Sequence, residues 1–344
     1  MNRTTEIELK EILEQLKQNP EDLDLLNLAA IGCFQNPKYN SDNQALSYFQ
    51  NAYELNKSVK TCHNLAWFLY FEYSEIEWRD KNVGSKEEAL LIQEYCLKLS
   101  PSSFYPYLQL GYMHLQSKKY DDAINYLEIA YSKTKDRRVI HNLGYCEFQI
   151  DKFKDASKYF RESSQIYDLE YRSLYNLALC EYLQGNINEV HSIISELESP
   201  DESKCKMDVE ISELYYLLGD YEAAANSTLK YGLNYIELLQ WNCLAYAVYQ
   251  KDKSIVMSEA QKGIKQRESH IQEIDSNHSD WSDWSVSALK ERRIELKEEI
   301  EFLENTEERF MKIPKLDPKE MILIESCGCL MFGCKQHGNL KNDE

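Results

Sequence analysis

The sequence contains few residues that break helices and no long hydrophobic run. Gly and Pro number 11 and 7 in 344 residues, about 5% of the chain where an average protein carries roughly 12%. Such scarcity leaves little room for the many turns of a β-sandwich or barrel, so we expect helices. No stretch reaches the roughly 18 uninterrupted apolar residues of a membrane span, and the amino terminus lacks the apolar core of a signal peptide. We therefore predict a cytoplasmic protein that makes no membrane contact.

Positive charge is also scarce. The chain has 39 Lys and Arg against 58 Asp and Glu, a net charge of −19. This excess repels phosphate backbones, which argues against nucleic acid as the main partner. A phosphate-binding Gly-rich loop, an HExxH motif and a nucleophile elbow are all missing from the sequence, so we expect neither enzymatic activity nor a resident cofactor apart from one possible zinc site.

Two residue types are present in informative numbers. Tyr occurs 25 times, against 11 Phe and 5 Trp, and its excess needs a location. Cys occurs 10 times, too seldom for a disulfide scaffold, and a reducing cytosol keeps such residues as free thiols.

An internal repeat runs through most of the chain. The segment that starts at His141 matches the one that starts at Tyr175 at a shift of 34 residues, and the copy around Gly111 matches the copy around Gly144 at a shift of 33. Each copy has two apolar runs at helical spacing, joined by a short polar turn. Because one such helix pair cannot bury its apolar face alone, neighbouring pairs must stack into a solenoid.

These copies resemble the tetratricopeptide repeat (TPR), and the best one carries Tyr107, Leu110, Gly111, Ala123 and Leu127 at the family's positions. The resemblance implies an all-α, right-handed superhelical solenoid of about seven helix pairs. We predict four regions: an N-terminal helix in residues 1–19, a TPR solenoid in 20–268, a linker and long heptad-like helix in 269–313, and a Cys/His-rich tail in 314–344.

The resemblance also implies that the first helix of each pair lines a concave groove. If the small residue of each copy is position eight, side chains at positions two, five, nine, twelve and thirteen face this groove. From the aromatic and basic residues at these positions, the predicted site comprises His63, Trp67, Tyr70, Tyr112, Arg138, His141, Tyr145, Phe148, Arg172, Tyr175, Tyr182, Tyr216 and Tyr246. Tyr-rich surfaces are typical of recognition sites, so we predict a scaffold that binds a protein or peptide segment. Alternatively, the rings pack between repeats.

Asparagine has a distinct place in the copies. Chaperone-binding relatives hold a terminal carboxylate with Asn at position nine of successive repeats, and position nine here holds other residue types. Asn recurs instead at position six, beside the small residue, as Asn27, Asn64, Asn142 and Asn176. We predict that these four make structural hydrogen bonds to the neighbouring backbone.

A heptad pattern follows the repeats. Leu289, Leu296, Leu303 and Phe310 lie seven residues apart. Such a stripe fits a coiled coil, hence self-association through residues 286–310, and it fits equally a helix that caps the last repeat.

The tail contains the most specific chemistry in the sequence. Cys327, Cys329, Cys334 and His337 form a C-x-C-x4-C-x2-H pattern, and three thiolates with one imidazole can complete a tetrahedral zinc site. Acylation of these cysteines and simple docking of the tail on the last helices are the alternatives. The rival function is accordingly a metal- or thiol-dependent sensor or enzyme whose working part is this tail.

Overall fold

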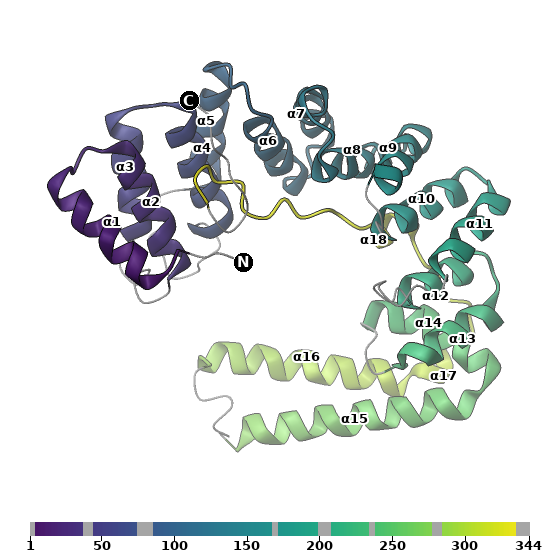
Figure 1. Cartoon of the computed structure of the whole chain (residues 1–344). Helices are drawn as coiled ribbons and strands as arrows, with labels where there is room; N and C mark the ends of the chain where they lie inside the picture. Colours follow the sequence, from purple (N-terminus) through teal and green to yellow (C-terminus); the bar gives the residue numbers. More distant parts are fainter. Residues whose placement is uncertain are drawn as a thin grey trace. The chain divides into compact units, whose positions relative to one another are not determined.

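A computed structural model describes residues 4–36, 44–73, 85–166, 171–198, 208–233, 238–276 and 284–334. Throughout these residues the regular structure is helical, with no strand (Figure 1). None of the described helices is both long and apolar enough to cross a membrane. The predicted all-α class is confirmed.

The chain packs into two compact units. Unit 1 comprises residues 1–167 and 323–344, and unit 2 comprises residues 168–322. This division differs from the single solenoid in 20–268 that the period predicts, and it places the end of the tail with the first repeats. The 33-residue period reports which helices pair locally, and it carries no information on where packing between pairs weakens.

Unit 1 begins with one helix and continues with four helix pairs. The helices are α1 (Glu6–Gln18), α2 (Leu23–Gln35), α3 (Gln44–Leu55), α4 (Val59–Phe68), α5 (Lys86–Lys98), α6 (Tyr105–Gln116), α7 (Tyr120–Lys133), α8 (Arg137–Gln149) and α9 (Phe153–Ile166). A π-helical turn, Leu69–Tyr73, extends α4. Side-chain caps fix several helix starts, including capping boxes at Thr5 and Ser58, which satisfy amide groups that a helix end leaves unpaired.

The small residue of each repeat is needed for close helix packing. A Cβ atom added at Gly111 would lie 2.8 Å from Leu127 Cγ, and one added at Gly144 would lie 2.9 Å from Phe160 Cε1. Both glycines stand on the first helix of a pair and both neighbours on the second, so the absent side chain sets the separation of the two helices.

Unit 2 holds three further pairs and the heptad helix. Its helices are α10 (Tyr171–Leu183), α11 (Ile187–Leu197), α12 (Asp208–Leu217), α13 (Tyr221–Tyr231), α14 (Leu238–Lys251), α15 (Lys253–Asp275), α16 (Val286–Glu304), α17 (Thr306–Arg309) and α18 (Pro318–Met321). With the four pairs of unit 1, the described residues contain seven TPR-like helix pairs, as predicted. Helix α15 continues through residue 268, where we had expected the repeats to end.

The heptad stripe is buried inside unit 2. Helix α16 packs along α15, and Leu296, Leu303 and Phe310 are almost fully buried. Ion pairs flank the stripe, among them Arg267 to Glu299 at 2.6 Å. The stripe therefore packs as the capping alternative expects, while self-association stays a prediction.

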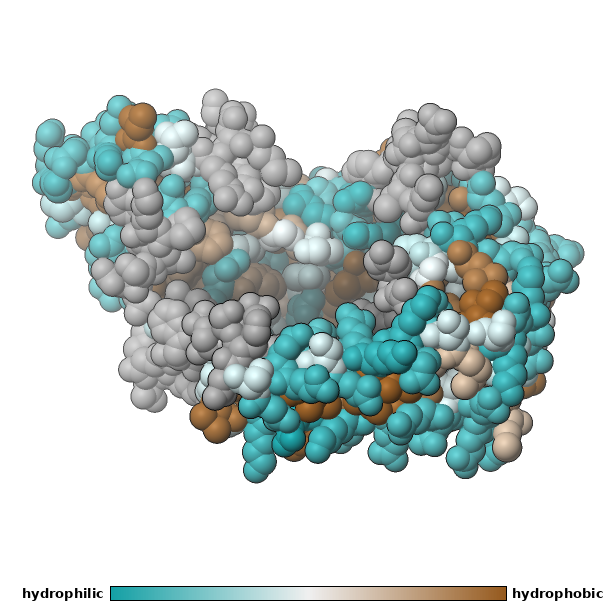
Figure 2. Space-filling view, turned by 90° about the horizontal axis from the view of Figure 1, so that it is seen from below, coloured by the Kyte–Doolittle hydropathy of each residue, from teal (hydrophilic) through white to brown (hydrophobic). Residues whose placement is uncertain are grey.

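Figure 2 shows one face of the molecule, on which hydrophilic residues prevail and hydrophobic residues form patches between them.

Candidate functional site

Residues 323–334, which we call the tail segment, lie along the first helices of the pairs in unit 1 (Figure 1). The segment has no regular secondary structure apart from a turn at its end. Its contacts come from α2, α4, α6 and α8, which are the helices that the TPR resemblance assigns to the groove. We call the contacting residues of these four helices the binding face.

Two side chains of α4 hold the end of the tail segment by its backbone. The Nε2 atom of His63 lies 2.9 Å from the carbonyl oxygen of Leu330. The Asn64 side chain donates to the carbonyl of Phe332 at 2.9 Å and accepts from the amide of the same residue at 2.8 Å. One Asn thus satisfies both backbone groups of a buried residue, which would be costly to leave unpaired.

The same two residue types recur on α8 with the same geometry. His141 Nε2 lies 2.9 Å from the carbonyl oxygen of Leu323. Asn142 donates to the carbonyl of Glu325 at 3.0 Å and accepts from its amide at 3.2 Å. In both places His meets residue i of the tail segment and Asn holds residue i+2. The two held residues, Glu325 and Phe332, are seven positions apart.

Further donors contact the backbone between these two places. Trp67 Nε1 donates to the carbonyl of Gly328 at 3.2 Å, and Arg138 Nη1 donates to the carbonyl of Cys327 at 3.3 Å. Gly328 has a φ of 57°, in the left-handed region that favours glycine. Burial raises the pKa of Tyr112, and the nearby Cys327 of the tail segment raises it further.

Side chains of the tail segment meet different surroundings at its two ends. Leu330, Met331 and Phe332 are fully buried, and the Phe332 ring lies 4.6 Å from the His63 ring and 6.2 Å, edge on, from Tyr105. At the other end, Glu325 forms an ion pair with Arg137 at 2.7 Å, and only 5% of the Glu325 side chain is exposed. The end at Phe332 is therefore held by apolar packing, and the end at Glu325 is held by an ion pair.

Burial fixes the protonation state of His63. Its pKa falls to about 4 because the surrounding protein replaces the water that would stabilise the imidazolium, an effect partly opposed by the bond to Leu330. Since a carbonyl oxygen only accepts, Nε2 carries the proton. The Nδ1 atom then accepts from Gln93 Nε2 at 3.4 Å. The neutral imidazole is thus held in the tautomer that donates to the tail segment.

Of the groove residues predicted in unit 1, His63, Trp67, Tyr112, Arg138 and His141 contact the tail segment. The others have packing roles in the described structure. Tyr70 is buried and donates to the carbonyl of Met113 at 3.0 Å. Phe148 is fully buried and meets Phe153 edge to face. The Tyr145 ring packs on Tyr120, and burial raises the pKa of Tyr145 to about 12.

The remaining predicted groove residues lie in unit 2. Tyr175 is fully buried and donates to Glu213 Oε2 at 2.5 Å, Tyr182 is half-buried, and Arg172 is exposed and interacts electrostatically with Glu210. The aromatic stripe of the sequence is thus divided between two units, and much of it supports the packing alternative.

Tyr216 and Tyr246 of unit 2 contact a second stretch of the post-repeat chain. The Tyr216 hydroxyl donates to the carbonyl of Pro314 at 2.7 Å, and the Cys243 thiol donates to the carbonyl of Lys315 at 3.4 Å. The Tyr246 ring meets Phe310 edge to face at 5.6 Å. In this contact, the side chains of unit 2 donate to backbone carbonyl groups, and the remaining interaction is ring packing.

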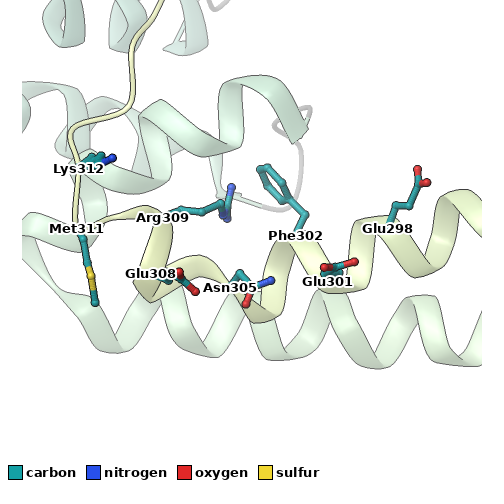
Figure 3. A pocket seen from close by; sticks show the side chains of 8 residues that line it. All are labelled: Glu298, Glu301, Phe302, Asn305, Glu308, Arg309, Met311 and Lys312. Atoms are coloured by element: carbon teal, nitrogen blue, oxygen red, sulfur yellow. The ribbon is translucent and has the colours of Figure 1, made fainter.

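An open hollow of about 650 Å³ lies beside α16 and α17 (Figure 3). It is lined by Glu298, Glu301, Phe302, Asn305, Glu308, Arg309, Met311 and Lys312. Its central cation is already engaged, since the Arg309 guanidinium lies 3.4 Å from the Phe302 ring centre and donates to Asn242 at 3.0 Å. The pKa of Arg309 falls to about 10 through burial. The hollow is lined by both carboxylates and cations, so it favours neither an anionic nor a cationic ligand. The binding face is therefore the stronger candidate for a functional site.

The predicted zinc ligands are not assembled in the described part of the tail. Cys327 is buried and accepts from Asn142 Nδ2 at 3.5 Å, whereas Cys334 accepts from Gln35 Nε2 at 3.3 Å. The neighbouring Cys334 and burial raise the pKa of Cys329. Among the described residues no three His, Cys, Asp or Glu gather to hold a metal ion. His337 lies outside the described residues. The expected zinc site therefore has no structural support.

Sequence reasoning missed Asn64, Asn142 and Arg137 as binding residues. The sequence predicts structural hydrogen bonds from the position-six Asn side chains to the neighbouring backbone. Asn27 does donate to the carbonyl of Leu23. Asn64 donates to Asn27 Oδ1 at 3.2 Å and also binds the tail segment, as Asn142 does. A signal was present, because the dipeptide His-Asn occurs at 63–64 and again at 141–142, in the same register of two repeats.

Several solved structures resemble the chain at low identity. YrrB, a TPR protein with an unusual peptide-binding site, is 14% identical, with 63% of this chain and 97% of YrrB covered at a TM-score of 0.44. PilF from Pseudomonas aeruginosa is 18% identical, with 64% and 94% covered at 0.49. Yeast Tom70 is 16% identical, with 89% and 62% covered at 0.46. No protein-family model and no curated protein matches the chain. Similarity at this level does not identify a ligand.

Proposed function

We propose that this chain is a protein-interaction scaffold whose binding face in unit 1 holds an extended polypeptide segment. One observation carries the proposal: two His-Asn pairs, in equivalent positions of two repeats, bond the backbone of the tail segment at a seven-residue interval. A protein that packs its own core ordinarily satisfies backbone groups within secondary structure. Here the side chains of helices do this for a segment that forms neither helix nor strand.

The chemistry of the binding face suits a polypeptide ligand. Asn offers one donor and one acceptor in a planar group, which matches the amide and carbonyl of a single extended residue. His, Trp and Arg add donors aimed at carbonyl groups. Such contacts depend on an extended backbone and are available to any segment that presents one, and the tail segment is the example that the chain carries with it.

The experiment supplies the tail segment as a separate molecule. Full-length chain with Phe332→Asp places a carboxylate among apolar side chains and so loosens its own tail. A fluorescein-labelled synthetic peptide of residues 320–334, kept reduced, is then titrated and followed by fluorescence anisotropy. We expect saturable binding to the variant and none to the natural chain at the same peptide concentration, because a tethered tail competes at an effective concentration of about a millimolar.

The control keeps the variant and removes the backbone contacts. Adding Asn64→Ala and Asn142→Ala to Phe332→Asp is expected to abolish peptide binding, while circular dichroism shows that the helices remain. Where Phe332→Asp does not fold, Phe332→Ala truncates the same ring without adding charge. Peptide binding that survives both Asn substitutions, or its absence from both loosened variants, would contradict the proposal.

A further inference from the structure

The tail segment has two residues whose backbone is clamped and whose side chain is also read. Asn142 holds both backbone groups of Glu325, and Arg137 pairs with the carboxylate of the same residue. Asn64 holds both backbone groups of Phe332, and the ring of the same residue lies against His63 and Tyr105. Once a clamp fixes the backbone of a residue, the direction of its side chain is fixed too.

Selectivity must come from these side chains. Hydrogen bonds to the backbone impose an extended conformation and do not distinguish one sequence from another. The Glu325 carboxylate is nearly buried, so a neutral residue at that position would lose the ion pair that Glu325 makes with Arg137. The Phe332 ring is completely buried, so a small or polar residue there would leave a void or an unpaired group.

Residues 326–329 are recognised less through their side chains. Ser326 and Gly328 are exposed, and Cys329 is half-buried. Cys327 is buried, but the bond that Arg138 makes to this residue goes to its carbonyl. The binding face therefore has an acidic point at Glu325 and an apolar point that ends at Phe332 and includes the fully buried Leu330 and Met331.

Resting on the proposed function, we infer that the partner of this scaffold is a protein segment that carries a carboxylate and, seven residues later, a large apolar side chain. Such a segment lies extended on α4, α6 and α8 in place of the tail segment, with its acid against Arg137 and its apolar residue between His63 and Tyr105. The chain's own Glu325 and Phe332 reproduce this pattern and compete for the same face, so the partner must be present at a concentration, or with an affinity, that outcompetes a tethered ligand.

A substitution scan of the peptide tests the pattern on the full-length Phe332→Asp chain. We expect Glu325→Gln in the peptide to weaken binding about tenfold, because a charge-assisted bond is lost. Phe332→Ala is expected to weaken binding about a hundredfold, because a buried ring is removed. The matched control is Glu320→Gln in the peptide, which makes the same change at an exposed residue and is expected to leave affinity within about twofold. A peptide with residues 325 and 326 exchanged moves the acid by one position and is expected to bind as weakly as Glu325→Gln.

Exchanging the charges of Arg137 and Glu325 tests their ion pair separately from the apolar contact. Arg137→Glu in the loosened chain is expected to reject the parent peptide and to recover most of its affinity for the peptide with Glu325→Lys. If the parent peptide binds but Glu325→Gln, Phe332→Ala and the exchanged peptide all bind equally well, the pattern is wrong and the proposed function stands. If the parent peptide does not bind at all, the proposed function itself fails. Sedimentation of the natural chain checks the remaining occupant, since a dimer lost on Phe332→Asp would make a second copy the partner and overturn the inference.

Discussion

The two units both bind a stretch of the chain that follows the repeats, but they do so with different chemistry. In unit 1, amide and imidazole side chains pair with the amide and carbonyl groups of the tail segment. In unit 2, a phenol and a thiol reach two carbonyls, and the rest of the contact is ring packing around Phe310. The phenol and the thiol each bind one carbonyl, whereas each Asn binds both backbone groups of one residue. The contact in unit 1 therefore agrees with the proposed binding of a peptide segment, and that in unit 2 agrees with a capping helix and its continuation.

Repeat position explains the contrast. Position six holds Asn64 and Asn142 on α4 and α8 of unit 1, but it holds Cys243 on α14 of unit 2. In unit 2 the apolar stripe of α16 supplies much of the packing, with Leu303 lying close to Gly263 of α15. Unit 1 receives no helix of this kind on its binding face within the described residues, and an extended segment lies there instead. On the helices that make these contacts, the residue at position six thus differs between the two units, and the bonds to the following chain differ with it.

The substitutions with the largest expected effect disrupt the contact between unit 1 and the tail segment and leave the contact in unit 2 intact. Asn64→Ala with Asn142→Ala removes both partners of the amides and carbonyls of Glu325 and Phe332. Buried backbone groups left unpaired cost about 1–3 kcal/mol each, so we expect the free energy of opening of the tail segment to fall by about 4 kcal/mol or more. Hydrogen exchange followed by mass spectrometry measures this directly, as lost protection over residues 323–334.

A matched substitution in unit 2 serves as the control for that experiment. Asn176 occupies position six of α10 and is buried. Asn176→Ala removes the same group from the same place in a repeat, and we expect it to leave exchange in the tail segment unchanged. Equal loss of protection in both variants would mean that the position-six Asn residues stabilise repeats in general, as the sequence alone suggested, and that the tail segment is not selectively bound.

A smaller effect comes from pH. Burial holds the pKa of His63 near 4, against about 6.5 in an unfolded chain. Between pH 4 and 6.5, His63 therefore binds a proton when the tail segment is detached and its ring is hydrated, but not when the segment is bound. Binding of the tail segment is thus most stable above about pH 6.5 and weakens as the pH falls toward 4. The full change amounts to about 3 kcal/mol. Hydrogen exchange at residues 330–334, corrected for the intrinsic pH dependence of exchange, should show it, and His63→Gln should flatten the profile. A natural chain whose protection is the same at both ends of this range would contradict this role of His63.

How far the sequence could predict these features depends on the range of the interactions. The helix pairs follow from apolar spacing and from small residues such as Gly111 and Gly144, which act over one repeat. The resemblance to the tetratricopeptide repeat implies which helix of each pair lines the groove. His63, Trp67 and Arg138, which it places there, contact the tail segment. The occupant could not be inferred, because the bond between Asn64 and Phe332 joins residues 268 positions apart and no local pattern encodes it. For the same reason the tail cysteines suggested a metal site, whereas Cys327 contacts Asn142.

The smallest expected effect concerns the contact in unit 2 and decides whether the two contacts are independent. Tyr216→Phe removes one buried hydrogen bond, to the carbonyl of Pro314, at a cost of about 1–2 kcal/mol. We expect faster hydrogen exchange around residues 310–317 and unchanged exchange in residues 323–334. Tyr246→Phe keeps a ring edge against Phe310 and is expected to change less. If Tyr216→Phe released the tail segment as well, the post-repeat chain would bind both units in one cooperative step, and the tail could no longer be treated as a ligand that leaves unit 1 while unit 2 stays closed. Independent release is what a displaceable segment requires, since a partner that had to open both contacts would also have to overcome the packed stripe of α16.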